Sequence, residues 1–331
     1  MKVQLVQRLV SECGFSGVVF ESQFYDMLNL EHSVAAKTAT REQVSDAIGA
    51  LWSRYAAFVP LEDWLVGEAA TCRVRIAGMD PQAGGVAGHY SQTKLAAVLS
   101  SVLSGTRRAE CERTLQRHDA WAYDDAHPFD AAALLGLRAC IGDVRQRLAS
   151  TGQGATPDLS AMAASYAAYL QFADGDPGGL RDRAMYDNVV WIRAHWPKGT
   201  RIVIWCASAH AAKTLEGVRP AIRPLGSYIH EAFGDRAAAI GFSALGGSYG
   251  NVGGRAPAHV LDSAVSGSLE ARAFAGDGAK PWRFLDREQL HAMGEVSARA
   301  LDYSESQVLD WSHVVDGMIV LRTETAAQAS H

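Results

Sequence analysis

Two kinds of apolar pattern follow each other at the start of the chain. Apolar residues recur at helical spacing over residues 3–13, and Gly14 follows where such a helix would end. The next segment, 17–21, is a short apolar run that ends on the carboxylate of Glu21. A run of this kind predicts a strand that is buried on both faces, as in a parallel sheet.

Helical and extended patterns continue to alternate in the later segments. Helical spacing fills residues 22–65, and alternation over 72–80 predicts a second strand that ends on Asp80. Residues 180–195 again have helical spacing, and the apolar segment 201–206 predicts another buried strand. Helices that alternate with buried strands favour an α/β fold with a mixed or mostly parallel sheet flanked by helices.

Strand patterns are absent from the alanine-rich stretch between about 85 and 175. Helical spacing predicts helices there at 92–103, 107–117, 130–149 and 158–172. Glycine- and proline-rich segments at 81–88 and 175–179 flank this stretch, so we interpret it as an inserted helical subdomain. The predicted organisation is a first core part at 1–84, the insertion at 85–175, a second core part at 176–325 and a disordered tail at 326–331.

The second core part contains weaker signals. Apolar runs at 237–242 and 318–321 predict further strands. The segments 244–256 and 263–280 are rich in glycine and serine, and we expect long loops there that line a site or move.

Composition narrows the function classes. With 48% apolar and 20% charged residues the chain is an ordinary folded protein, and its net charge of -5 makes nucleic acid an unexpected partner. We find no apolar run of membrane-spanning length and no signal peptide, and so expect a cytoplasmic protein with no membrane partner. The oligomeric state is left open.

The five cysteines are scattered at wide intervals, unlike a disulfide framework or a zinc site. We expect them to be small buried apolar side chains, with a catalytic thiol left open only for Cys206 at the end of a predicted strand. No metal-ligand cluster and no nucleotide-binding glycine motif occurs in the sequence, so neither a metal nor a cofactor is predicted.

Candidate chemistry lies just beyond the predicted strands, because ligands of open α/β sheets bind at the carboxyl ends of the strands. Glu21 and Asp80 end two strands, and His210 follows a third. A carboxylate beside an imidazole forms a pair in which the acid orients the base. Each residue also has a structural reading: Glu21 as a solvated or helix-capping residue, Asp80 as a turn residue, and His210 as a hydrogen-bonded structural histidine.

Several stretches, in order along nearly the whole chain, together resemble the erythromycin esterase family. They are Leu9-Val10 with Gly14-Phe15, Val18-Val19-Phe20-Glu21, Ala77-Gly78-Met79-Asp80-Pro81-Gln82, the stretch 181–191, Trp205-Cys206-Ala207-Ser208-Ala209-His210, Gly267-Ser268-Leu269-Glu270 and Asp316-Gly317-Met318-Ile319-Val320. The resemblance implies an α/β fold with a helical insertion, and metal-independent hydrolysis of an ester or macrolide lactone by activated water.

The resemblance also assigns residues. Glu21 matches the functional glutamate that ends the family's second strand, and Lys2 falls where the family carries a basic side chain on the preceding helix. His210 matches the second histidine of the family's Trp-Ala-His-Asn-x-His pattern, whereas Ala207 and Ser208 replace its first histidine and its asparagine. Catalysis is therefore expected from Glu21 and His210.

The family's Gly-Glu-x-Thr-His-Gly motif would lie about ten residues before Lys2 and is not in the chain. The chain is therefore expected to begin one strand and one catalytic motif late. We accordingly expect either an esterase of macrolides or related small molecules, with antibiotic resistance as one possible role, or a truncated or degenerate relative that binds a ligand without turnover. Lys2, Tyr25 and Asp80 are the expected substrate-binding residues.

Overall fold

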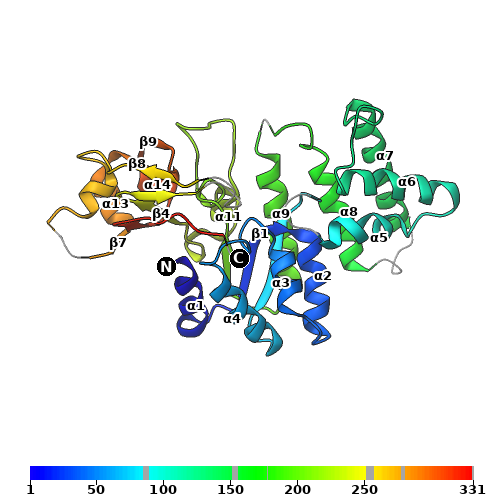
Figure 1. Ribbon diagram of the computed structural model, residues 1–331, viewed down its shortest axis with the longest axis horizontal. Coiled ribbons are helices and arrows are strands. Elements are labelled where there is room, and N and C mark those ends of the chain that lie inside the picture. The colour runs from blue at the N-terminus through cyan, green and yellow to red at the C-terminus, as the bar shows by residue number, and fades with distance from the viewer. Residues whose placement is uncertain (85–88, 151–155, 177, 251–256, 277–279, 330–331) are drawn as a thin grey trace. The chain divides into compact units, whose positions relative to one another are not determined.

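The chain divides into two compact units. The computed structural model describes residues 1–84, 89–150, 156–176, 178–250, 257–276 and 280–329 (Figure 1). The first unit holds residues 1–54, 58–176 and 187–205, and the second holds residues 55–57, 177–186 and 206–331. No helix in these ranges is both long and apolar enough to cross a membrane.

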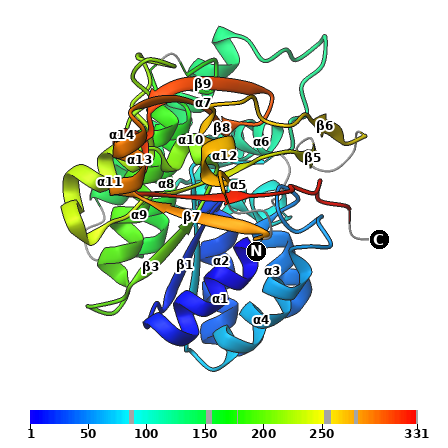
Figure 2. The same cartoon turned by 90° about the vertical axis from the view of Figure 1, so that its left-hand side faces the viewer.

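The first unit contains a three-stranded parallel sheet with the strand order β2-β1-β3 (Figure 2). Its strands are β1 (Gly17–Gln23), β2 (Arg75–Asp80) and β3 (Ile202–Trp205). Phe20 in the central strand lies opposite Gly78 on one side and Trp205 on the other. Every residue of β1 is buried, which confirms the strand that the apolar run predicts.

Helices α1 (Lys2–Cys13), α2 (Phe24–Ala35), α3 (Arg41–Ile48) and α4 (Val59–Ala70) lie before β2 in the sequence, and α9 (Leu180–His195) precedes β3. Helix α1 ends as predicted, since Gly14 has a φ of 71° and its N–H donates to the carbonyl of Leu9. Helix α3 begins with reciprocal bonds between Thr40 and Gln43, which satisfy two backbone N–H groups of its first turn. Local sequence signals thus set these helix ends.

The part of the first unit between β2 and α9 is helical, as predicted. It contains a short π-helix (Ser91–Leu95), α5 (Ala96–Ser100), α6 (Gly105–Asp119), α7 (Ala131–Ser150) and α8 (Pro157–Tyr169), which lie together in Figure 1. Their ends differ from the predicted ones by a few residues, and the predicted joints lie partly outside the described residues, at 85–88 and 177. The fold class expected from the sequence is therefore confirmed.

A disulfide links Cys111 of α6 to Cys140 of α7, across a Cα–Cα distance of 5.4 Å. Both side chains are buried as expected, but the expectation that these cysteines form no disulfide was wrong, because the packing of two helices brings together cysteines 29 positions apart. The expectation of burial was wrong for Cys13 and Cys72, which are exposed. Cys206 is half-buried and is not part of a disulfide.

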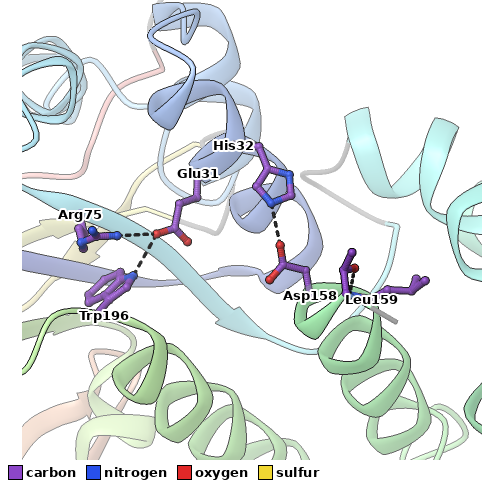
Figure 3. Close-up of polar contacts among 7 residues, drawn as sticks. Glu31, His32, Arg75, Asp158, Leu159 and Trp196 are labelled. Atoms are coloured by element: carbon purple, nitrogen blue, oxygen red, sulfur yellow. Dashed lines mark hydrogen bonds and ion pairs between the residues drawn. The ribbon is translucent and has the colours of Figure 1, made fainter. Parts of the chain in front are cut away.

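Polar contacts also connect α2 to its neighbours within the first unit (Figure 3). Nε2 of His32 lies 2.7 Å from Oδ2 of Asp158 in the first turn of α8. On the same helix, Glu31 accepts hydrogen bonds from Arg75 of β2 and from the indole N–H of Trp196, which follows α9. The His32–Asp158 pair is an acid–histidine contact at the surface, since the His32 side chain is 59% exposed.

The second unit is built around a three-stranded mixed sheet with the order β4-β10-β7. Its strands are β4 (Ile240–Ala244), β10 (Gly317–Leu321) and β7 (Trp282–Asp286). Strand β10 pairs with β4 in parallel and with β7 in antiparallel orientation. Two hairpins accompany it, β5 (Gly247–Tyr249) with β6 (His259–Leu261) and β8 (Glu295–Asp302) with β9 (Glu305–Asp310).

The helices of the second unit are short. They are α10 (Ser208–Ala211), α11 (Leu225–Phe233), a 3₁₀ turn (Gly234–Arg236), α12 (Leu269–Ala273), α13 (Arg287–Met293) and α14 (Trp311–Val314). The expected long loops at 244–256 and 263–280 are thus interrupted by β5 and α12, while 251–256 and 277–279 lie outside the described residues. These elements were not predicted because the segments are rich in glycine and serine. A short two-stranded hairpin contains too few apolar residues to give a strand pattern.

Two stretches that carry the family resemblance, 267–270 and 316–320, each contribute a carboxylate that holds the second unit together. Glu270 is buried and accepts hydrogen bonds from Ser243 and from the backbone N–H of Arg299. Asp316 accepts from Lys213 and from the backbone N–H of Ala239. Both carboxylates join segments distant in sequence.

Candidate active site

Glu21 lies at an irregularity of the first unit's sheet. Between the paired residues Phe20 and Gln23, strand β1 has two residues, Glu21 and Ser22, where β2 has only Met79. Two residues opposite one form a β-bulge, which bends a strand and redirects its side chains. The Glu21 side chain is therefore held within the strand and is only 7% exposed, so it does not extend freely into water.

Gly78 makes room for this bulge. A Cβ atom at Gly78 would lie 2.5 Å from the carbonyl oxygen of Ser22 and 2.7 Å from that of Gln23. Only a residue without a side chain allows the bulged backbone to approach β2 so closely.

The expected substrate-binding residues, all of which lie in the first unit, differ in exposure. Tyr25 is fully buried in α2, and its hydroxyl donates to the carbonyl of Pro81 at 2.6 Å. Asp80 ends β2, is 7% exposed and accepts from the backbone N–H of Gln82 at 3.2 Å. Tyr25 and Asp80 thus meet at the loop after β2, whereas Lys2 is exposed as the first residue of α1.

A buried acid network lies close to this loop. Oδ1 of Asp26 accepts from the backbone N–H groups of Tyr90 and Ser91, and Oδ1 of Asp119 accepts from the hydroxyl of Tyr166 at 2.7 Å. The Oδ2 atoms of both aspartates are buried without a hydrogen-bond partner in the described part of the chain. Burial raises the pKa of Asp26, and it raises the pKa of Asp119 to about 8. Asp119 is therefore largely protonated at neutral pH.

Aromatic rings surround the C-terminal ends of β1 and β3. The ring of Trp205 lies 5.5 Å from that of Phe58, 5.8 Å from that of Trp52 and 6.2 Å from that of Phe20. The indole N–H of Trp52 is buried and has no hydrogen-bond partner among the residues described. These rings form an apolar cluster next to the bulge that carries Glu21.

His210 belongs to the second unit, in the single helical turn of α10. Its Nδ1 lies 2.8 Å from Oδ1 of Asp182, and the same Oδ1 accepts the backbone N–H of Leu225 at 2.7 Å. The side chains of Asp182 and His210 are only 5% and 17% exposed. A buried carboxylate is thus held by one backbone bond and directed at the imidazole.

Arg181 sits at the other nitrogen of the same ring. Nη1 of Arg181 lies 3.2 Å from Nε2 of His210. A guanidinium only donates hydrogen bonds and a carboxylate only accepts them. The two contacts therefore assign His210 as a neutral imidazole with its proton on Nδ1 and a lone pair on Nε2, the form that a general base needs.

Sequence reasoning found His210 but missed both of its partners. Asp182 and Arg181 lie 28 and 29 positions earlier in the chain, in the first turn of α9. The available signal was the stretch 181–191, which carried the family resemblance without any role for its charged residues. Among the described residues, no three His, Cys, Asp or Glu side chains gather in a way that could hold a metal ion.

Three solved structures share this fold. A protein from Bacillus cereus is 18% identical, with a TM-score of 0.73 over 100% of this chain and 86% of that one. A variant of erythromycin esterase EreC in its open conformation is 15% identical, with a TM-score of 0.70 over 99% and 86% of the two chains. A succinoglycan biosynthesis protein is 15% identical, with a TM-score of 0.74 over 100% and 84%. At these identities the likeness establishes the fold.

The curated proteins include no match to this sequence. The model of the erythromycin esterase family, in contrast, matches residues 10–323. That span includes β1 with Glu21, the start of α9 with Asp182, and His210. The chain therefore belongs to the erythromycin esterase family.

Proposed function

We propose that this protein hydrolyses a small-molecule carboxylic ester or lactone by activating water, without a metal ion. The observation that carries the proposal is the Asp182–His210 pair, whose geometry leaves a lone pair on Nε2. Membership of the erythromycin esterase family supports the reaction class. A macrolide lactone is the substrate that the family name suggests. The cytoplasmic location of the protein remains a prediction.

The proposed step begins with a water molecule that donates one proton to Nε2 of His210 while its oxygen forms a bond to the carbonyl carbon. The electron pair of the carbonyl π bond moves to the carbonyl oxygen. Collapse of this tetrahedral species breaks the bond to the alkoxy oxygen, which takes the proton from Nε2. Asp182 stabilises the imidazolium that exists between the two transfers, since a nearby negative charge favours the charged form of the ring.

Roles are also proposed for residues of the first unit. Glu21, fixed by the bulge, is proposed as the second catalytic group, and Lys2 as the cation that keeps it ionised. Asp80 and Tyr25 are proposed to shape the substrate site, with Tyr25 acting through the loop after β2, because its side chain is fully buried.

The alternative proposal is a relative that binds a ligand without turnover. The observation that favours this alternative is Ala207, the residue directly before α10. The family resemblance predicts a histidine at this position. Loss of a general acid or base typically lowers a rate by about 10²- to 10⁴-fold. A chain with only His210 at this position therefore has less catalytic capacity.

The experiment compares wild type with His210→Gln and Glu21→Gln on a panel of esters and macrolides. Both variants are expected to lose about 10²- to 10⁴-fold in kcat while their circular dichroism spectra stay unchanged. His32→Gln is the matched control, because it removes an exposed acid–histidine pair with nearly the same nitrogen–oxygen distance, 2.7 Å. Full activity of His210→Gln, or a wild-type protein inert toward every substrate, would contradict the hydrolase proposal.

A further inference from the structure

We propose that the substrate carries a carboxylate, that Arg181 binds this group, and that the binding releases Nε2 of His210. The inference rests on the proposed hydrolase function and deepens it, because it assigns a substrate class and a positioning residue. Its starting point is the 3.2 Å contact between Nη1 of Arg181 and Nε2. In this contact the lone pair that would accept the proton of water is already occupied.

The Arg181–His210 contact is one that a carboxylate can replace. A neutral imidazole offers the guanidinium one acceptor atom and no opposite charge. A carboxylate offers two acceptor oxygens in the planar, paired geometry that matches a guanidinium, and it adds a full opposite charge to both hydrogen bonds. Bound carboxylate therefore draws the guanidinium away from Nε2, and water takes its place at the ring.

The other side of the imidazole is built to stay in place during this exchange. Oδ1 of Asp182 holds Nδ1 and is itself held by the backbone N–H of Leu225. Asp182 is 4% exposed, so water competes poorly for its bonds. The ring therefore keeps its proton on Nδ1 while the partner of Nε2 changes.

The location of Arg181 favours an anion. Arg181 is the second residue of α9, a helix of 16 residues, so its side chain starts from the turn that carries the positive end of the helix dipole. Asp182 is the acidic residue of that first turn, and its Oδ1 is already engaged by His210 and Leu225. An incoming carboxylate thus meets the guanidinium together with a favourable field.

Arg183 provides a matched control on the same helix. It lies two positions further on, where helical side chains do not share a face. Its guanidinium is 5.8 Å from the ring centroid of Tyr186 and 5.4 Å from that of Tyr228. Replacing Arg183 removes the same charge from the same turn and leaves both residues of the Arg181–His210 contact in place.

The activity test uses two 4-nitrophenyl esters, the monoester of glutaric acid and the ester of pentanoic acid, which differ by a terminal carboxylate. Arg181→Gln is expected to lower kcat/KM for the glutarate monoester by about 10- to 100-fold more than for the pentanoate ester. Arg181→Lys is expected to restore part of that difference, and Arg183→Gln to behave as wild type. Equal losses on both esters, or no loss, would overturn the proposal.

A second measurement needs no turnover and so separates this inference from the hydrolase proposal. The ¹⁵N resonance of Nε2 in His210 is followed by NMR while acetate, or neutral acetamide, is added. Acetate is expected to shift the resonance in wild type and in Arg183→Gln, but not in Arg181→Gln, and acetamide is expected to have no effect. An unresponsive wild-type resonance sinks the inference even if esters are hydrolysed, whereas a response without hydrolysis refutes only the hydrolase proposal.

Discussion

Gly226 of α11 lies so close to the carbonyl oxygen of Ala211, the last residue of α10, that a Cβ atom at position 226 would overlap it. The carbonyl oxygen of Ala212 is nearly as close. Helix α10 carries His210. Because Gly226 has no side chain, α10 can pack closely against α11, and this packing determines the position of the imidazole. The position of the proposed base thus depends on a residue that has no functional group.

Gly226→Ala is expected to displace α10, with a loss of stability of about 1 to 3 kcal/mol from overpacking and a larger fractional loss of ester hydrolysis. Urea unfolding and kcat/KM measure the two effects. Gly142→Ala in α7 is the control, because a Cβ atom there meets nothing within 4 Å, and it is expected to be neutral or to stabilise the helix. Equal behaviour of the two variants would show that the close approach has no consequence.

Two substitutions separate the contribution of the Asp182 charge from the contribution of its hydrogen bonds. In Asp182→Asn the remaining carbonyl oxygen still accepts from His210 and Leu225, so the fold is expected to persist while kcat falls about a hundredfold through loss of the charge. Asp182→Ala also leaves the buried N–H of Leu225 without its acceptor, which costs about 1 to 3 kcal/mol. Unaltered kcat in both variants would remove Asp182 from the mechanism.

The buried carboxyl of Asp119 makes stability depend on pH. Its pKa rises on folding from 3.8 to about 8 because of burial, so between these values the folded chain holds a proton that the unfolded chain has lost. The free energy of unfolding is therefore expected to fall as pH rises toward about 8, by about 1.4 kcal/mol per pH unit at most from this group. At pH values above about 8, Asp119 is ionised in both the folded and the unfolded chain, and the whole energetic cost of burying its charge lowers the stability of the fold.

Asp119→Asn is expected to abolish this component, because an amide does not titrate and its oxygen still accepts from Tyr166. Tm measured across a pH series, as the difference between variant and wild type, isolates the effect from all other groups. Parallel pH profiles would mean that Asp119 ionises normally in the folded protein.

The disulfide between Cys111 and Cys140 is expected to stabilise the α6–α7 pair by about 3 kcal/mol, since it closes a loop of 29 positions in the unfolded chain. Urea unfolding of Cys111→Ser measures this loss, and Cys72→Ser, at an exposed free thiol, is the control. Alkylation of the unreduced, denatured protein should label only Cys13, Cys72 and Cys206. Labelling at Cys140 would contradict the crosslink.

The helices and strands of the first unit could be predicted where a short stretch of sequence is enough to define them. The apolar run before Glu21 needs no partner to be recognised as a strand, and Gly14 ends α1 by its own conformation. The bulge at Glu21 was not predictable, because it arises from the register between β1 and β2. That register depends on the close approach of Gly78 to carbonyls far away in sequence.

The site was predictable only in part for the same reason. His210 was found because it follows a strand, whereas Asp182 reaches it from the first turn of another helix and leaves no local pattern. Cys111 and Cys140 are likewise joined by helix packing, which spacing does not reveal. The short strands β5 and β6 carry too few apolar residues to be separated from a loop.

The edge-to-face contact between Trp52 and Trp205, with centroids 5.8 Å apart, has an optical consequence. Two indoles this close couple their electronic transitions, so the pair adds a signal to the near-ultraviolet circular dichroism of the folded protein. Trp205 ends β3, and His210 follows five positions later in the chain. The molecule therefore carries a built-in chromophore whose spectrum reports on the strand end that leads into its proposed catalytic histidine.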